Sequence, residues 1–301
     1  MLDQLNARLD QVAQIANMEL LLVVGTAKSG TTWVQRMLDT HPEIYCPGEG
    51  KFTPLIRGFT KTVSEYNKEL ANTNRVVYPN GAYYRTWDET DITTAFQFMA
   101  ALCWTKSNHK DFSRVRYIGD KDTRYHNSEM ITAWRDHLFK GAKVVHVIRD
   151  GRDSVISLVH HMKRTNSAPI EIGSEEFEKV LGDYAKVWAE NIQRTRKAFR
   201  DRPHLYHEVR YEDLLEKPDR RLNAILAFLD VERTPDLVQH IVAENTFRKL
   251  SGGRKAGAED RDSFYRKGVA GEWEKALSPR ARKIFSDSSG DILELLGYKK
   301  Y

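Results

Sequence analysis

The most constraining feature of the sequence is an apolar run that leads into a glycine turn and then into a helical pattern. Leu20–Val24 contains only aliphatic residues and is followed by Gly25. A short run without alternation is typical of a strand buried on both faces of a parallel sheet. Because a helix is predicted over Thr31–Thr40, the turn between them brings backbone N–H groups and a helix dipole to one point. We therefore expect an anion-binding, P-loop-like turn.

Further alternation of strand and helix signals predicts an α/β fold. Three more strands are expected at Val115–Gly119, Lys143–Ile148 and Leu205–Arg210. Further helices are expected at Glu129–Phe139, Arg152–His161, Glu175–Arg200 and Asp219–Leu229, after Ser278-Pro279, and after Asp291. Since no repeat or flexible linker interrupts the chain, we predict one domain over residues 1–301, a central parallel β-sheet flanked by helices.

Three segments stand apart from this pattern. Residues 1–18 carry an amphipathic stripe and predict a docking helix. An aromatic-rich insertion, about residues 50–112, is expected to wall an acceptor pocket. The glycine-rich, basic stretch of about residues 250–273, which includes Arg254, predicts a mobile lid.

Composition excludes several classes of protein. Cys46 and Cys103 are too few for a disulfide framework or a Cys-rich zinc site, and no metal-ligand constellation is recognisable. The apolar runs are far shorter than the roughly 20 residues of a membrane helix. A net charge of +5 favours an anionic ligand, but the scattered basic residues form no nucleic-acid groove. We expect a cytoplasmic protein that binds no metal, nucleic acid or membrane.

The turn differs from that of P-loop kinases. Lys28 precedes Gly30, whereas a Walker A loop has its lysine after the second glycine. Lys28 therefore stands in the loop itself, where its charge can reach a nucleotide anhydride. Hydroxyl and backbone donors come from Ser29, Thr31 and Thr32, and Trp33 offers a face for a purine. A nucleotide kinase would in addition need an acidic Mg²⁺ ligand at the end of a neighbouring strand, where this chain has Arg149.

These residues resemble a known family. The segment Thr26–Trp33 is similar to the 5′-phosphosulfate loop of sulfotransferases that use 3′-phosphoadenosine 5′-phosphosulfate (PAPS). Two further family motifs follow in order and imply contacts with the 3′-phosphate: Arg149 with Ser157, and Arg266-Lys267-Gly268. Tyr211, Thr246 and Phe247 resemble family positions around the ribose and adenine. The resemblance runs from about Leu20 to Trp273.

The resemblance implies transfer of a sulfuryl group from PAPS to an acceptor hydroxyl, leaving adenosine 3′,5′-bisphosphate (PAP). Lys28 would stabilise the leaving phosphate, and Lys121 matches a family lysine. The acceptor is expected to be a phenol, an alcohol or a tyrosine, in a small molecule or a peptide. A nucleotide-binding protein without transferase activity is the alternative. No dimer segment of the cytosolic family is recognised, so the sequence leaves the oligomeric state open.

The motifs do not identify the residue that acts as the general base. Thr123 stands where small-molecule sulfotransferases have a histidine. Glu49, between two glycines, lies in a segment that resembles the region where tyrosylprotein and heparan sulfotransferases, and many bacterial relatives, have a catalytic glutamate. We favour Glu49 and expect burial to raise its pKa. His126 and Asp122 are the alternatives.

Overall fold

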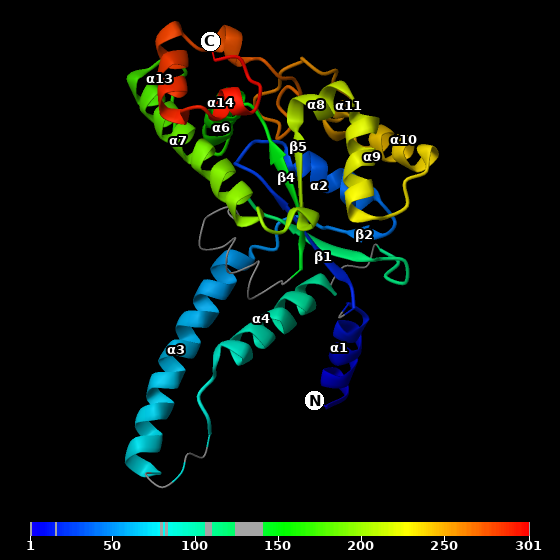
Figure 1. Cartoon of the computed structure of the whole chain (residues 1–301), viewed down its shortest axis with the longest axis vertical. Helices are drawn as coiled ribbons and strands as arrows, with labels where there is room; N and C mark the ends of the chain where they lie inside the picture. The colour runs from blue at the N-terminus through cyan, green and yellow to red at the C-terminus, as the bar shows by residue number, and fades with distance from the viewer. Residues whose placement is uncertain are drawn as a thin grey trace.

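The computed structural model describes residues 2–15, 17–78, 81, 84–105, 110–123 and 141–300. Within these ranges five strands form one parallel sheet in the order β2-β3-β1-β4-β5 (Figure 1). The strands are β1 (Glu19–Val24), β2 (Ile44–Tyr45), β3 (Tyr117–Lys121), β4 (Lys143–Ile148) and β5 (Tyr206–Arg210). The predicted α/β class and its central parallel sheet are confirmed.

Helices cover both faces of this sheet. They are α1 (Leu2–Ile15), α2 (Thr31–Thr40), α3 (Phe52–Val77), α4 (Glu89–Trp104), α6 (Gly151–Arg164), α7 (Glu175–Ala198), α8 (Tyr211–Glu216), α9 (Pro218–Leu229), α10 (Pro235–Glu244), α11 (Phe247–Leu250), α12 (Trp273–Ala276), α13 (Pro279–Ser289) and α14 (Ile292–Leu295), with a 3₁₀ turn, η2, at Pro203–Leu205. No helix in the described ranges has the length and apolarity that a bilayer span requires.

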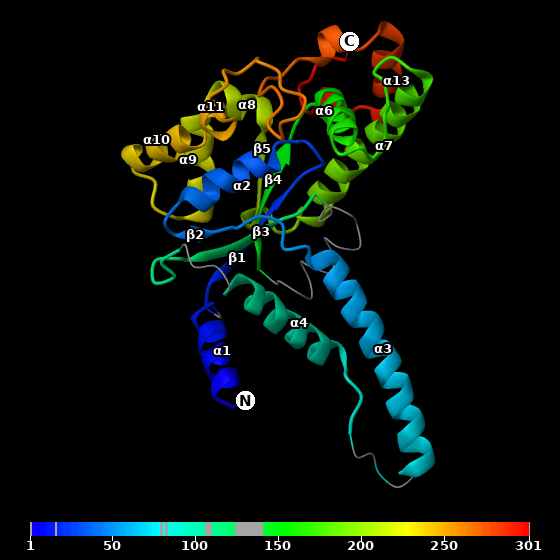
Figure 2. The same cartoon turned by 180° about the vertical axis from the view of Figure 1, so that it is seen from behind.

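The burial pattern explains why the strands read as unbroken apolar runs. Leu21 and Val23 of β1 pack on one face with α2, α9 and α10, while Leu22 and Val24 pack on the opposite face with α4. A third cluster joins the end of β4 to α6, α7, α13 and α14. The two groups of helices lie on opposite sides of the sheet in Figures 1 and 2.

Most predicted boundaries agree with the structure to within a few residues. β4 and α2 have the predicted ends, and Ser278 caps α13 by accepting a hydrogen bond from the Ala281 amide. β2 was not predicted, because a two-residue strand gives no periodic signal. The helix predicted over Glu129–Phe139 lies outside the described residues.

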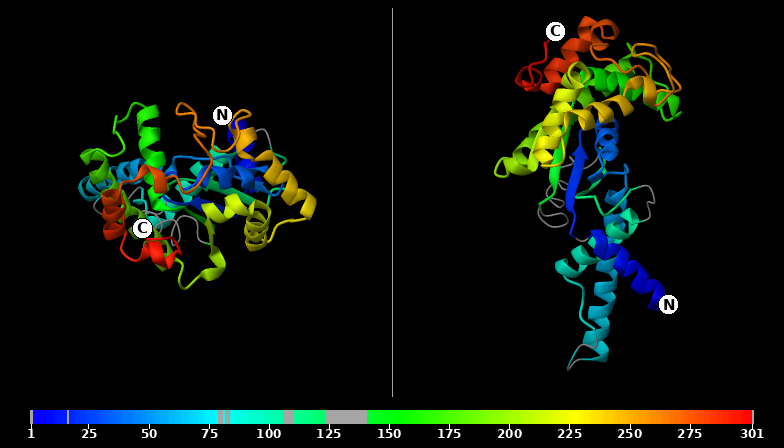
Figure 3. Two further views of the ribbon diagram at one scale, coloured as in Figure 1. Left: turned by 90° about the horizontal axis from the view of Figure 1, so that it is seen from above. Right: turned by 90° about the vertical axis from the view of Figure 1, so that its right-hand side faces the viewer.

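The described part of the insertion of residues 50–112 forms an arm. Its long helix α3 extends away from the sheet, as views 90° apart show, whereas α4 packs beneath β1 (Figures 1 and 3). An Asp88/Asp91 capping box starts α4, and α1 lies against α4. The lid segment between α11 and α12 crosses the opposite end of the molecule (Figure 2).

Candidate active site

One cavity of about 450 Å³ lies beyond the carboxyl ends of β1 and β4. These two strands are neighbours, and the chain continues from β1 to one side of the sheet and from β4 to the other. Parallel sheets bind ligands at such a switch point, because the loops there diverge. The turn after β1, Arg149 after β4, α6 and the lid all line the cavity.

The predicted turn follows β1 and leads directly into α2. Gly30 is the N-cap of α2 and has a φ of 94°, and a Cβ at this position would lie 2.5 Å from the Tyr211 ring. Lys28 also has a left-handed backbone, with a φ of 70°. Ser29 is buried in the turn, and its Oγ has no hydrogen-bond partner among the described residues. The turn is therefore shaped to bring its donors to one point.

Lys28 is the main charge of the cavity. Burial lowers its pKa to about 8, and neighbouring positive charges act in the same direction. These charges belong to Arg164, Arg149, Lys121 and Arg266. None of the ion pairs in the described part of the chain involves Lys28, whose Nζ lies 4.7 Å from the centre of the Phe264 ring. A half-buried ammonium among cations is a binding site for an anion.

Arg149 is held rigidly at the floor of the cavity. Its guanidinium donates to the carbonyl oxygens of Lys28, over 3.2 Å, and Val269, over 3.1 Å, and stacks 4.6 Å from the centre of the Tyr211 ring. Its side chain is 9% exposed, and the buried Nε has no partner among the described residues. Arg149 therefore links the turn to the lid, and its Nε–H group is free to donate a hydrogen bond to a ligand.

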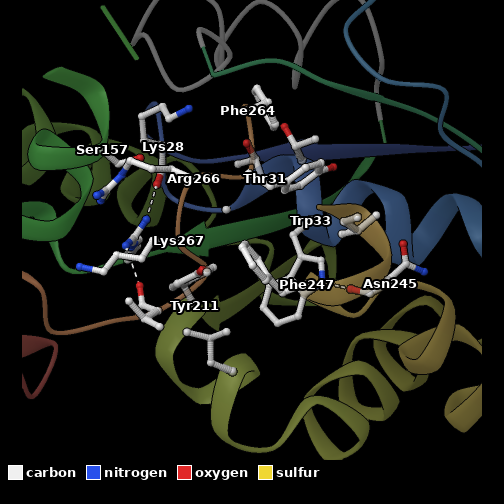
Figure 4. Close-up of a pocket in the computed structure, with 18 of the residues that line it drawn as sticks. Lys28, Thr31, Trp33, Ser157, Tyr211, Asn245, Phe247, Phe264, Arg266 and Lys267 are labelled. Carbon is white, nitrogen blue, oxygen red and sulfur yellow. Dashed lines mark hydrogen bonds between the residues drawn. The ribbon is translucent and has the colours of Figure 1, made fainter. Parts of the chain in front are cut away.

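Both charged and aromatic side chains line the cavity. In Figure 4, Lys28, Ser157, Arg266 and Lys267 lie on one side and the rings of Trp33 and Phe247 on the other, with Tyr211 between them. Trp33 donates from Nε1 to the Asn245 carbonyl over 2.8 Å, so its ring orientation is fixed. A cavity with a cationic side and an aromatic side suits a nucleotide with several phosphates.

The lid contributes cations that are already paired. The Arg266 guanidinium binds Glu259 over 2.7 Å and also Glu272, while Lys267 binds Glu272 over 3.1 Å. Burial alone would raise the pKa of Glu272, but these partners hold it at about 2. Together with His160, the two carboxylates form the one described cluster with metal-ligand spacing. Because Arg266 neutralises both carboxylates, Glu259 and Glu272 serve to position the Arg266 guanidinium.

The end of the lid is fastened to α6. Asp153 accepts hydrogen bonds from the amides of Gly271, over 2.6 Å, and Trp273, over 2.9 Å. The Arg152 guanidinium, paired with Asp150 over 2.7 Å, lies 3.4 Å from the centre of a Trp273 ring.

Glu49 lies at the mouth of the cavity, and its pKa is lowered, whereas the sequence analysis expected a raised pKa. Lys121 donates to Glu49 Oε1 over 2.5 Å, and Lys51 binds Oε2. Burial alone would raise the pKa of Glu49, but the two lysines outweigh it and hold the pKa below 4.5. The expectation of a raised pKa was therefore wrong, because two ammonium groups stabilise the carboxylate.

The structure brings most predicted site residues to this one cavity. The lining includes Lys28, Gly30, Thr31, Thr32, Trp33, Glu49, Lys121, Arg149, Ser157, Tyr211, Thr246, Phe247, Arg266, Lys267 and Gly268. Ser29 and Asp122 are buried and do not line it. Arg254 instead binds lid carbonyls, among them that of Arg266. His126 lies outside the described residues. No described residue of the range 50–112 lines the cavity.

Sequence reasoning missed several lining residues near Lys28, namely Leu158, His161 and Phe264. Nδ1 of His161 pairs with the Arg164 guanidinium over 3.1 Å. Burial and the charges of Lys28 and Arg164 lower the pKa of His161. The spacing in the sequence could have indicated His161 as a lining residue, because it follows Ser157 by four residues and lies on the same face of the helix.

The fold and the site together define a class, that of α/β proteins with a phosphate-binding turn and a polyanion cavity. The sequence profile of the sulfotransferase family matches residues 21–236. This chain belongs to the sulfotransferase family.

Relatives and solved structures agree with this assignment. A protein-tyrosine sulfotransferase sequence of Caenorhabditis briggsae is 23% identical over 284 residues, covering 93% of this chain and 89% of the relative. Protein-tyrosine sulfotransferase 2 of Gallus gallus is 23% identical, with coverage of 74% and only 54%. Mouse sulfotransferase SULT7A1, crystallised with PAP, has a similar fold with a TM-score of 0.59, 16% identity and coverage of 95% and 92%. The predicted PAPS-dependent sulfotransferase class is confirmed.

Proposed function

We propose that the cavity binds PAPS through the residues predicted from the sequence and that Glu49 accepts a proton from a phenolic acceptor. The observation that carries the proposal is Lys28, a half-buried ammonium with cationic neighbours and no ion pair among the described residues. Arg149 lines the cavity, and its buried Nε is a donor without a described partner. Unused positive charge and an unused donor fit a bound polyanion.

In this proposal the cationic side of the cavity binds the phosphates of the nucleotide, and the aromatic side binds the adenine. Lys28 and the amides at the start of α2 would hold the 5′-phosphosulfate. Arg149 and Ser157 would hold the 3′-phosphate, with Arg266 and Lys267 above it. The rings of Trp33 and Phe247 would enclose the adenine, with Tyr211 beside the ribose. No metal is invoked, because these side chains supply the positive charge.

Bound PAPS supplies a sulfuryl group on a good leaving group. The acceptor oxygen forms a new S–O bond as the bond from sulfur to the 5′-phosphate oxygen breaks, and the electron pair of that bond stays with the phosphate. Lys28 stabilises the charge that develops there. Glu49 takes the hydroxyl proton, so the products are a sulfate ester and PAP.

The acceptor is proposed from the wall beside Lys28. Leu158 and Phe264 are apolar and line the same cavity as Glu49 and Lys121. A ring that carries a hydroxyl matches an apolar wall with a carboxylate at its edge. The names of two relatives, both protein-tyrosine sulfotransferases, support a tyrosine as the acceptor.

The test is a panel of acceptors incubated with PAPS and the full chain and read by mass spectrometry. We expect one added SO₃ group on tyrosine peptides or phenols, and less on aliphatic alcohols and glycans. Binding of PAP without a sulfated product on any acceptor would overturn the transferase proposal. Sulfation of alcohols alone would overturn the phenolic assignment and leave the donor site intact.

A further inference from the structure

Lys28 has a backbone conformation that a lysine does not favour. The non-glycine residues with a left-handed backbone in the described ranges are Lys28, Lys51, Asn166 and Asp230. Asn and Asp tolerate this conformation, whereas a lysine adopts it only at a cost. Both lysines belong to the site, since Lys28 lines the cavity and Lys51 binds Glu49. Such strain persists only where neighbouring contacts hold the backbone in place.

The conformation of Lys28 is set by the two peptide planes that flank its Cα atom. A peptide unit is planar, so a contact to its carbonyl or to its amide orients the whole plane. The second plane is held at both ends. Arg149 donates to the Lys28 carbonyl over 3.2 Å, and the Ser29 amide donates to the Thr26 carbonyl over 3.1 Å. The orientation of this plane is therefore fixed by the turn and by Arg149.

The first plane is held by Tyr184. The Tyr184 hydroxyl donates a hydrogen bond of 2.9 Å to the Ala27 carbonyl oxygen. Among the described residues, no other group hydrogen-bonds to this plane, through either the Ala27 carbonyl or the Lys28 amide. Burial raises the pKa of Tyr184, so its hydroxyl keeps the proton and remains a donor.

Tyr184 belongs to a helix that is itself firmly packed. It lies on α7, is 8% exposed and is part of the apolar cluster that joins α6, α7, α13 and α14. Trp188 follows four residues later on the same face of α7 and donates from Nε1 to the Arg149 carbonyl over 3.1 Å. One face of α7 therefore contacts both the turn after β1 and the residue that follows β4.

We propose that Tyr184 is a positioning residue, whose hydroxyl holds Lys28 in the left-handed conformation that keeps the Lys28 ammonium in the cavity. The inference rests on the proposed role of Lys28 at the 5′-phosphosulfate. Without the hydroxyl the first plane is free to turn, and Lys28 relaxes toward the right-handed region that lysine prefers. Because the side chain leaves the Cα atom in a direction set by the two planes, the ammonium then moves from its place beside the Phe264 ring.

Tyr184→Phe tests the proposal, because it removes the hydroxyl and keeps the ring that packs in the core. We expect the Kd for PAP, measured by calorimetry, to rise about three- to tenfold, the usual contribution of one hydrogen bond. Tyr117→Phe is the matched control. Tyr117 is buried at the first residue of β3, at the end of the sheet opposite the cavity, and its hydroxyl donates to Glu19 over 2.8 Å. This control should leave the Kd unchanged.

Titration of Lys28 in the free protein tests the positioning without any ligand. The Lys28 Nζ signal is followed by NMR in protein that carries isotope-labelled lysine, and it is assigned as the signal missing in Lys28→Arg. Burial and neighbouring cations lower the pKa of Lys28 to about 8. In Tyr184→Phe the ammonium moves away from them, so this pKa should rise. A merely structural role of the hydroxyl would lower the melting temperature and leave the pKa in place.

A double-mutant cycle shows whether Tyr184 acts through Lys28. In a Lys28→Ala background, Tyr184→Phe should cause no further rise in the PAP Kd, because the side chain that it positions is missing. Full additivity of the two substitutions would mean that the hydroxyl affects binding by another route, and it would overturn the proposal.

Two other results would also overturn it. One is a Tyr184→Phe protein in which both the pKa of Lys28 and the PAP Kd are unchanged. The other is a Tyr184→Phe protein that circular dichroism shows to be unfolded, since the hydroxyl would then be required for folding. A wild-type chain that binds no PAP, but whose Lys28 pKa still rises in Tyr184→Phe, would support the positioning of Lys28 and contradict only the donor site.

Discussion

Nζ of Lys121, the last residue of β3, donates a 2.5 Å hydrogen bond to Oε1 of Glu49. The contact joins a residue fixed in the sheet to one on the loop after β2. It positions the carboxylate at the cavity mouth and keeps it ionised. Glu49 is therefore a weak base that is always in its basic form at neutral pH.

Replacing this carboxylate should affect transfer and leave nucleotide binding intact. For Glu49→Gln we expect kcat to fall about 10²–10⁴-fold, the usual contribution of a general base. PAP affinity measured by calorimetry should change less than threefold, because Glu49 is on the acceptor side. A variant with unchanged kcat would remove Glu49 from the proposed mechanism.

The low pKa of Glu49 should appear in the pH profile. Lys51 and Lys121 hold this pKa below 4.5, so the acidic limb of kcat/KM should lie below that pH. Lys51→Ala removes one stabilising charge, raises the pKa and moves the limb to higher pH. The exposed Lys61→Ala is the control and should leave the profile in place.

PAP should bind more weakly at alkaline pH, because Lys28 loses its positive charge there. Its pKa of about 8 in the unliganded protein means that it loses its charge above that pH. Binding of the anion to the ammonium form then requires proton uptake, and the apparent Kd should rise up to about tenfold per pH unit above 8. In Lys28→Arg the charge persists, and the rise should disappear. Calorimetry in buffers of different ionisation enthalpy measures the proton directly.

Arg149 should contribute strongly to cofactor affinity. Loss of a charge-assisted hydrogen bond costs about 1.5–3 kcal/mol, so Arg149→Ala should weaken PAP binding roughly 10- to 150-fold. Since Arg149 also binds the Lys28 and Val269 carbonyls, the melting temperature of the variant is measured in parallel. Arg194→Ala, an exposed arginine on α7, is the control. Equal affinities of the two variants would argue against a phosphate contact.

A paired glycine experiment isolates the lid contact with Phe247. Gly268 has a φ of 64°, and a Cβ there would collide with the Phe247 ring. Gly257 in the same lid has a φ of 91° with open space around it. Both alanine variants bear a backbone cost of about 1–2 kcal/mol, but only Gly268→Ala displaces Phe247. We expect a larger rise in PAP Kd for Gly268→Ala, and equal effects would contradict the adenine role of Phe247.

Local patterns predicted the parts of the fold that depend on neighbours in sequence. The strand before Gly25, the helix at Thr31–Thr40 and the motif after Ile148 are read from runs of adjacent residues, and each appears where expected. The ordered motifs also predicted that Lys28, Arg149 and Arg266 would share a site. Their convergence depends on sheet order, which the family resemblance supplied.

The features of the site that the sequence did not predict have a common physical cause. Each depends on contacts between residues that are distant in the sequence. The ionisation of Glu49 depends on Lys121, 72 residues away, so its environment could not be read from the flanking glycines. His161 and Phe264 line the cavity because α6 and the lid meet above the turn. The aromatic residues of the insertion lie mostly on α3 and α4 where the structure describes them, and none of the described ones lines the cavity.

Both ends of the lid are tied down, the first by α11 and the second by Asp153, which holds Gly271 and Trp273 against α6. A loop fixed at both ends loses little conformational entropy when it closes over a ligand. If PAPS binds as proposed, nucleotide exchange needs movement of only the middle of the lid, and Arg266 can pass between the phosphate and the carboxylates of Glu259 and Glu272. Arg266 would then have an anionic partner both with and without the nucleotide, because Glu259 and Glu272 hold its guanidinium in the unliganded protein.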